Sequence, residues 1–281
     1  MDGRLRLLCV VAHPDDESLA LGGTLARYAS EGIETSLVVA TRGELGWTGS
    51  PADYPGPVAL GRIREAELRS AAAALGLRQV EFLDYLDGSL AGVDPAGPVA
   101  AIVAAVRRVR PAVVVTFGPD GAYGHPDHIA ISQFTTAAVV CAADPSYEPG
   151  RGAAPHRVAK LYHRIWTADE LADFEAVFHD AGIDVGGERR RWVSWPDWAV
   201  AARLDTAEHW AAVRAAVACH RSQVGGYRTL AVLPPEGHRR LWGRQQFARA
   251  MSTVHVGHGV EEDLFAGLRE GTIAADERRV A

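Results

Sequence analysis

Two short clusters of histidine and aspartate carry residue types that bind metal ions and transfer protons. In the first, AHPDDE, His13 and Asp16 are three residues apart and Asp15 lies between them. The second, AYGHPDH, ends in His128. Three ligands drawn from histidine and carboxylate, with a fourth position left for water, are typical of a catalytic rather than a structural zinc site. The clusters therefore predict a hydrolytic metal centre that includes His13, an aspartate and His128.

The other polar residues of these clusters are suited to proton transfer. An aspartate that does not bind the metal is free to accept a proton from water, whose pKa falls to roughly 7 on zinc. His125 is expected to stabilise a developing oxyanion or to protonate a leaving nitrogen. Tyr123 lies in a short turn between two glycines, which let the backbone bend sharply. It is expected near the mouth of the site. Spacing alone leaves open whether Asp15 or Asp16 is the metal ligand.

Each cluster follows directly on a buried strand. The apolar runs at residues 4–12 and 112–117 are typical of central strands in a parallel sheet covered on both faces. Between and after them, strands and helices are predicted to alternate. The expected strands cover residues 34–40 and 80–83, and the expected helices cover residues 17–31, 60–75, 98–110 and 126–143.

This alternation predicts a Rossmann-like, doubly wound α/β fold with a mostly parallel sheet. If the strand order is 3-2-1-4, the first and fourth strands are neighbours at the point where the order reverses. Ligands bind at the carboxyl edge of such a sheet, so the two clusters are expected to face each other there.

We expect two regions along the chain. Residues 1–145 form the catalytic core with both motifs, and residues 146–281 form a C-terminal α/β extension that packs on the core and completes the pocket. Within the extension, a strand is expected at residues 158–166, with helices at 168–181, 206–222 and 239–251. The arginines at residues 189–191 are interpreted as a solvated turn. The segment from His220 to Gln223 is expected to cap or pack a helix end.

Composition excludes several function classes. The net charge of −6 and the lack of a basic stripe speak against nucleic-acid binding. No apolar segment is long enough for a signal sequence or a membrane span, so we expect a cytoplasmic protein. The first strand is followed by HPDDES rather than G-x-G-x-x-G, and two carboxylates there would repel a nucleotide phosphate. The sequence is compatible with a homo-oligomer.

The two motifs together resemble the LmbE-like, PIG-L family of zinc-dependent de-N-acetylases, which includes the deacetylases of mycothiol and bacillithiol biosynthesis. The resemblance rests on AHPDDE and AYGHPDH and covers about residues 5–143. It implies that His13, Asp16 and His128 bind zinc and that Asp15 is the general base. Iron(II) is the alternative ion, because histidine and aspartate ligands accept either metal.

The same resemblance assigns four further residues. His125 and Tyr123 would polarise the scissile carbonyl and stabilise the tetrahedral intermediate. Arg64 is similar to a substrate-contacting arginine, and Asp87 to an acidic residue near an inositol site. The alternatives are a solvated charge on a helix for Arg64 and an ordinary turn residue before a glycine for Asp87.

The predicted activity is removal of an N-acyl group, in particular acetyl, from a small-molecule amino-sugar conjugate of the N-acetylglucosamine type. An amidase for a bulkier thiol-sugar or other amide conjugate is the nearest alternative. A non-catalytic metal-binding protein is disfavoured, because a site that only binds metal needs neither Asp15 nor His125.

Overall fold

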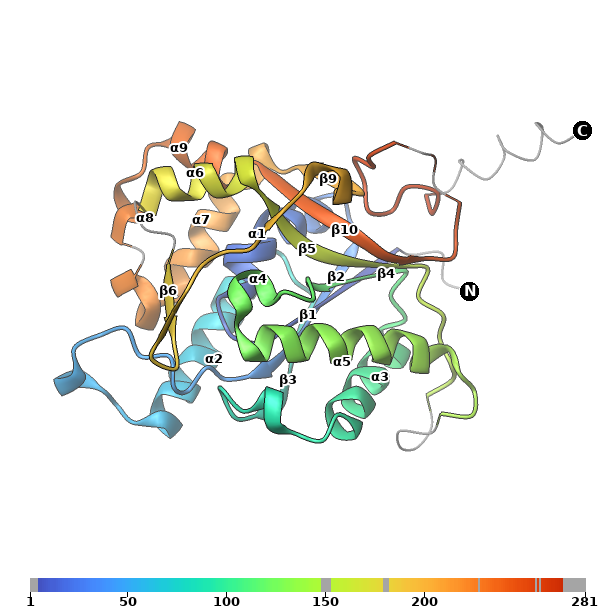
Figure 1. Cartoon of the computed structure of the whole chain (residues 1–281), viewed down its shortest axis with the longest axis horizontal. Coiled ribbons are helices and arrows are strands. Elements are labelled where there is room, and N and C mark those ends of the chain that lie inside the picture. Colours follow the sequence, from blue (N-terminus) through green and yellow to red (C-terminus); the bar gives the residue numbers. More distant parts are fainter. Residues whose placement is uncertain are drawn as a thin grey trace, which may run out of the picture.

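The fold centres on one continuous, mostly parallel sheet (Figure 1), seen in a computed structural model that describes residues 5–147, 153–178, 182–226, 228–255, 257 and 259–269. In sheet order the strands are β3 (Gln79–Tyr85), β2 (Glu34–Thr41), β1 (Arg6–Val11), β4 (Val113–Phe117), β5 (Lys160–Thr167), β10 (Arg244–Ser252) and β9 (Ala202–Asp205). Strands β1 to β5 are parallel, and β10 and β9 are antiparallel additions. The predicted order 3-2-1-4 is confirmed.

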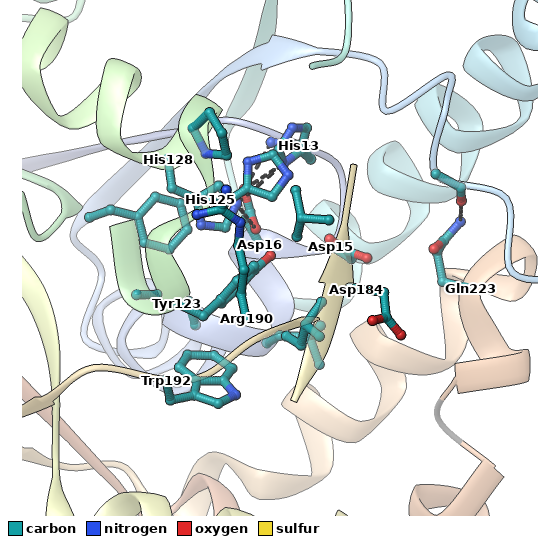
Figure 2. A pocket seen from close by; sticks show the side chains of 18 of the residues that line it. His13, Asp15, Asp16, Tyr123, His125, His128, Asp184, Arg190, Trp192 and Gln223 are labelled. Carbon is teal, nitrogen blue, oxygen red and sulfur yellow. Dashed lines mark hydrogen bonds and ion pairs between the residues drawn. The ribbon is translucent and has the colours of Figure 1, made fainter. Parts of the chain in front are cut away.

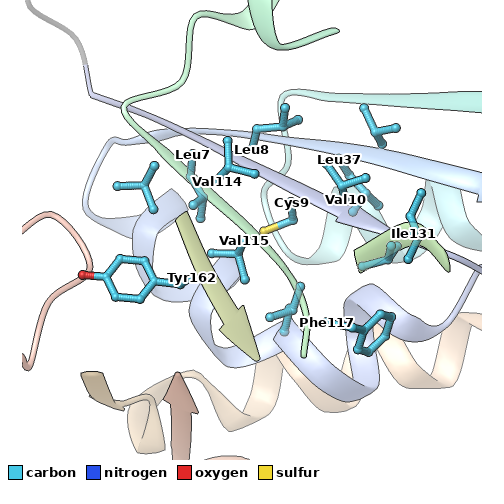
Figure 3. Close-up of a cluster of buried hydrophobic side chains, with 14 of the residues drawn as sticks. Leu7, Leu8, Cys9, Val10, Leu37, Val114, Val115, Phe117, Ile131 and Tyr162 are labelled. Carbon is cyan, nitrogen blue, oxygen red and sulfur yellow. The ribbon is translucent and has the colours of Figure 1, made fainter. Parts of the chain in front are cut away.

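The centre of the sheet is buried on both faces, as the unbroken apolar runs of its strands predict. Every residue of β4 is buried, as is every residue of β1 after Arg6. Figure 3 shows Val114 and Val115 beside Leu8 and Cys9 in this core. The rigid centre fixes the positions at which β1 and β4 end, and the two motifs begin there.

Helices cover both faces of the sheet. The chain leaves β1 in one direction along the sheet and returns from β3 to β4 in the other, so right-handed crossovers place the connecting helices on opposite faces. Accordingly α3 packs against α5, while α1 and α2 pack against α7. These helices are α1 (Asp16–Ser30), α2 (Pro57–Ala74), α3 (Ala96–Val109), α5 (Pro126–Ala143) and α7 (Trp210–Cys219).

The C-terminal half extends the same sheet. The prediction of a helix over residues 239–251 is wrong, because α9 (Pro235–Trp242) ends early and β10 begins at Arg244. Here tertiary pairing outweighs local propensity. Strand β10 pairs with β5 on one side and β9 on the other, and its Gln245 side chain accepts a hydrogen bond from the Thr24 backbone N–H of α1.

The segment between β5 and β9 reaches the carboxyl edge of the sheet. It comprises α6 (Ala168–Phe178), a hairpin of β6 (Ile183–Val185) and β7 (Glu188–Arg190), and the short strand β8 (Ser194–Trp195). Figure 1 shows the hairpin extending past α4 (Gly121–Gly124). A further short α-helix, α8, spans Arg228–Val232. No helix among the described residues is both long and apolar enough to span a membrane.

Candidate active site

Three side chains from the two motifs converge where β1 and β4 end. His13 Nδ1 lies 3.3 Å from His128 Nε2. Asp16 places Oδ2 3.7 Å from His13 Nδ1 and Oδ1 3.4 Å from His128 Nε2. All three residues are less than 10% exposed, and Figure 2 shows them grouped at one end of the pocket. Ligands about 2 Å from a tetrahedral metal ion lie at comparable distances from one another. The arrangement could bind such an ion.

His13 is oriented by carboxylates on its other ring nitrogen. Its Nε2 lies 3.2 Å from Asp127 Oδ2 and 3.1 Å from Asp87 Oδ1. Metal-binding histidines usually direct their second nitrogen at a carboxylate in this way. Burial disfavours charge on His13, yet the hydrogen bonds to Asp127 and Asp87 raise its pKa to about 10. The surroundings therefore favour a positive charge at this position, which a divalent cation would also supply.

Asp127 holds His13 in this orientation, a role that was not predicted from the sequence. The residue is fully buried, and its carboxylate accepts hydrogen bonds from the backbone N–H groups of Gly88 at 2.7 Å and Leu90 at 3.0 Å. One buried carboxylate thus ties the Asp87 turn to His13. Its position between the two histidines of the second motif is the signal that could have revealed it.

Asp15 lies beside the three grouped side chains, facing Arg64. Its backbone is left-handed, with φ 98°. Arg64 Nη2 lies 3.3 Å from Asp15 Oδ2. Burial raises the pKa of the Asp15 carboxyl, and the charge of Arg64 opposes that rise. Arg64 is 4% exposed and also donates to the Gly43 carbonyl at 2.8 Å, so the solvated alternative for it is wrong.

A buried ion pair supports the Asp15 turn from behind. Glu17 Oε2 accepts the Asp15 backbone N–H at 2.9 Å, and Glu17 Oε1 lies 2.7 Å from His220 Nε2. Glu17 and His220 are both 0% exposed. Burial opposes both charges, but their mutual attraction lowers the pKa of Glu17 and raises that of His220. His220 therefore packs, as predicted, against a partner that its sequence position did not reveal.

We expect His220→Leu to lower the free energy of unfolding by about 3 kcal/mol, because it leaves the buried Glu17 carboxylate without its partner. Urea denaturation measures the change. The double variant Glu17→Gln/His220→Leu removes the stranded charge and should recover part of the loss. As a control, Arg240→Ala breaks an exposed pair with Asp173 and should cost well under 1 kcal/mol. Equal losses for the single and double variants would contradict this account.

The second motif forms a tight turn that carries Tyr123 and His125. The His125 Nδ1 accepts the Asp127 backbone N–H at 3.1 Å, so the ring proton lies on Nε2. Burial, together with the charge of His13, lowers the pKa of His125 to about 4. At neutral pH His125 is therefore an uncharged N–H donor. Burial also keeps the pKa of Tyr123 well above its usual value, so its hydroxyl stays protonated.

These groups open into a pocket of about 900 Å³. One wall is polar and includes Arg64, Asp87 and Gln223. The opposite wall comes from the C-terminal half and is rich in aromatic and aliphatic side chains, among them Trp166, Phe174, Ile183 and Trp192. Figure 2 shows Trp192 and Gln223 on opposite sides of the site.

All eight predicted site residues line the pocket, and Arg190 is among the further residues that line it. The prediction of a solvated turn is wrong for Arg190, which is partly buried and donates to the Gly124 carbonyl at 2.7 Å. The run of charged residues suggested exposure to solvent, and only the hairpin geometry turns its middle member, Arg190, toward the pocket. Asp87 is more than a turn residue, since its carboxylate contacts His13 and accepts the Leu45 N–H at 3.1 Å.

This fold and site define an α/β protein with a cluster of histidine and aspartate side chains, able to bind a metal, at the carboxyl edge of its sheet. The sequence profile of GlcNAc-PI de-N-acetylases (PIG-L) matches residues 8–139. A Rhodococcus jostii protein named 1D-myo-inositol 2-acetamido-2-deoxy-alpha-D-glucopyranoside deacetylase is 37% identical over 94% of this chain and 98% of its own length. A Streptomyces griseus protein of the same name is 35% identical over 95% of this chain and 90% of its own length. The chain belongs to the PIG-L family, which confirms the resemblance found in the motifs.

Solved structures share this architecture. A conserved protein from Thermus thermophilus superposes with a TM-score of 0.64 at 29% identity, covering 91% of this chain and 99% of that one. The N,N'-diacetylchitobiose deacetylase of Pyrococcus horikoshii gives a TM-score of 0.62 at 17% identity, covering 87% of this chain and 83% of that one. The second likeness concerns the fold alone.

Proposed function

We propose that this protein is a zinc-dependent deacetylase that hydrolyses the acetamide of an N-acetylglucosaminyl-inositol conjugate. The observation that carries the proposal is the convergence of two imidazole nitrogens and a carboxylate within 3.3–3.7 Å, beside a second, separately held carboxylate. The substrate class follows the names of the relatives that match nearly the whole chain.

His13, Asp16 and His128 would hold the metal. Asp16 is well prepared for this, because its Oδ2 accepts the backbone N–H groups of Ala12 at 3.2 Å and His13 at 2.8 Å while Oδ1 faces His128. Zinc bound there would polarise the amide carbonyl and lower the pKa of water. Iron(II) suits the same ligands, and availability decides between them.

Asp15 would be the general base. Its carboxylate takes a proton from the water that attacks the carbonyl carbon, and the same proton then passes to the amide nitrogen as the C–N bond breaks. The products are the free amine and acetic acid, which ionises to acetate. A carboxylate with a raised pKa suits both transfers. The contact with Arg64 holds it in place.

His125 and Tyr123 would stabilise the tetrahedral intermediate. The neutral His125 offers Nε2–H, and the protonated Tyr123 offers its hydroxyl. Donors that are already in position gain strength in a buried site, where little reorganisation is needed. Arg64 and Asp87, on the polar wall, would contact hydroxyl groups of the sugar and the inositol.

The direct test is acetate release from N-acetylglucosaminyl-inositol, with N-acetylglucosamine, its malate glycoside and N,N'-diacetylchitobiose as comparison substrates. We expect release from the inositol glycoside by zinc-loaded protein, loss after chelation, and recovery on adding zinc. Iron(II)-loaded protein is assayed in parallel. Protein that binds one equivalent of zinc yet releases acetate from none of the four would contradict the amino-sugar assignment.

A further inference from the structure

A segment of the C-terminal half crosses the turn that carries Tyr123 and His125. Residues 190–195, here called the strap, run from the end of the β6–β7 hairpin into β8. The strap contacts the turn at four successive points. Figure 2 shows two of its residues, Arg190 and Trp192, beside Tyr123.

The turn has an unfavourable backbone conformation that needs such support. Ala122 has φ 68° and ψ −60°, a region that residues with a side chain rarely adopt. Gly121 precedes it with φ 64°, and a Cβ there would lie 3.0 Å from the Ile129 backbone nitrogen. Strained backbone of this kind persists where the surrounding structure over-determines it, and it is concentrated at functional sites.

Two of the four contacts are made to the backbone of the turn. Arg190 Nη1 donates to the Gly124 carbonyl at 2.7 Å, and the Val193 N–H donates to the Ala122 carbonyl at 2.8 Å. Together they bind the carbonyl groups on either side of Tyr123. The position of Tyr123 along the turn is therefore set from the strap.

The other two contacts are made by tryptophans. The Trp192 ring meets the Tyr123 ring edge-on, with centroids 5.2 Å apart. Trp192 is itself packed against Trp166 of β5. The Trp195 Nε1 donates to Asp120 Oδ1 at 2.9 Å, and Asp120 Oδ2 caps the turn by accepting the Ala122 N–H at 3.0 Å. Pairing of β8 with β5 anchors the end of the strap to the sheet.

We propose that the strap positions the turn for catalysis, with Arg190 and Trp195 as positioning residues that act through Tyr123 and His125. The inference rests on the proposed deacetylase function. Because the strap does not hold His13, Asp16 or His128, its loss should affect kcat without affecting metal binding. Small displacements of groups that stabilise a transition state lower the rate steeply.

The experiment uses the full-length protein with Arg190→Met, Trp195→Phe and the conservative Arg190→Lys. Arg189→Met is the matched control, because Arg189 is the neighbouring arginine and forms its ion pair with Asp184 at the exposed hairpin. Four quantities are measured for each variant: kcat, KM, zinc content, and backbone amide hydrogen exchange of the peptide spanning residues 120–125.

Arg190→Met and Trp195→Phe should lower kcat on the order of 10-fold, leaving KM within about 2-fold and zinc content unchanged. Their 120–125 peptide should exchange faster, and Arg190→Lys should recover most of kcat. The control should match the unmodified protein. Unchanged exchange and kcat in both variants, or loss of kcat together with zinc, would overturn the proposal. If the unmodified protein releases no acetate, the proposed function fails, and exchange alone then decides whether the strap holds the turn.

Discussion

Replacing Asp15 by asparagine is expected to lower kcat by about 10² to 10⁴-fold while the protein keeps its full equivalent of metal. Asparagine has nearly the same size and still faces Arg64, but its amide cannot accept the proton from water or pass it on. The atoms proposed to bind the metal are on other residues, and the Asp15 carboxylate faces Arg64. Initial rates of acetate release and zinc content per chain are measured on the same preparation.

Asp53→Asn is the matched control, an exposed aspartate in the loop between β2 and α2 that does not line the pocket. It should leave kcat unchanged. Loss of zinc from Asp15→Asn together with its activity would show that Asp15 is a ligand, and the separation between base and ligand would then be wrong.

Replacing His128 by alanine is expected to weaken zinc binding by more than about 100-fold and to abolish measurable turnover at equimolar zinc. The ring is 2% exposed and stacks on Phe117 at 4.1 Å between centroids, and its Nε2 lies 3.3 Å from His13 Nδ1. The cavity left by the ring will also lower stability somewhat. Competition with a chromogenic chelator gives the affinity, and circular dichroism confirms that the variant is folded.

His209→Ala, a histidine outside the pocket, serves as the comparison for this variant. It should bind zinc as tightly as the unmodified protein. If His128→Ala still binds zinc tightly, the third ligand must be another residue. His125 would be the first residue to test, since its ring nitrogen lies within 4.8 Å of one on His13.

The part of the fold that positions His13, Asp16 and His128 could be predicted from sequence because its signals are local. Unbroken apolar runs mark β1 and β4, helices lie between the strands, and the handedness of crossovers then sets the order of the sheet. The strand order in turn brings together His13 and His128, which are 115 residues apart in the chain.

Features that depend on partners far away in the chain could not be predicted from these local signals. Strand β10 is a strand because β5 and β9 pair with it, although its own residues, rich in arginine, glutamine and alanine, favour a helix. The partner of Glu17 is 203 residues away, and Asp127 acquires its role only when β1 brings His13 beside it. Arg190 turns inward because the hairpin does so, which a run of three arginines does not indicate.

The pairing of Glu17 with His220 has a consequence for how the protein is made. The first motif is synthesised early, yet the group that neutralises its buried glutamate comes from a segment more than 200 residues later. Closing so long a loop is slow relative to local folding. During translation the early strands and helices will therefore form around a glutamate that still needs solvent, and the Asp15 turn will settle only after α7 arrives. A nascent chain arrested before His220 should expose that turn to proteases, even if its sheet has begun to assemble.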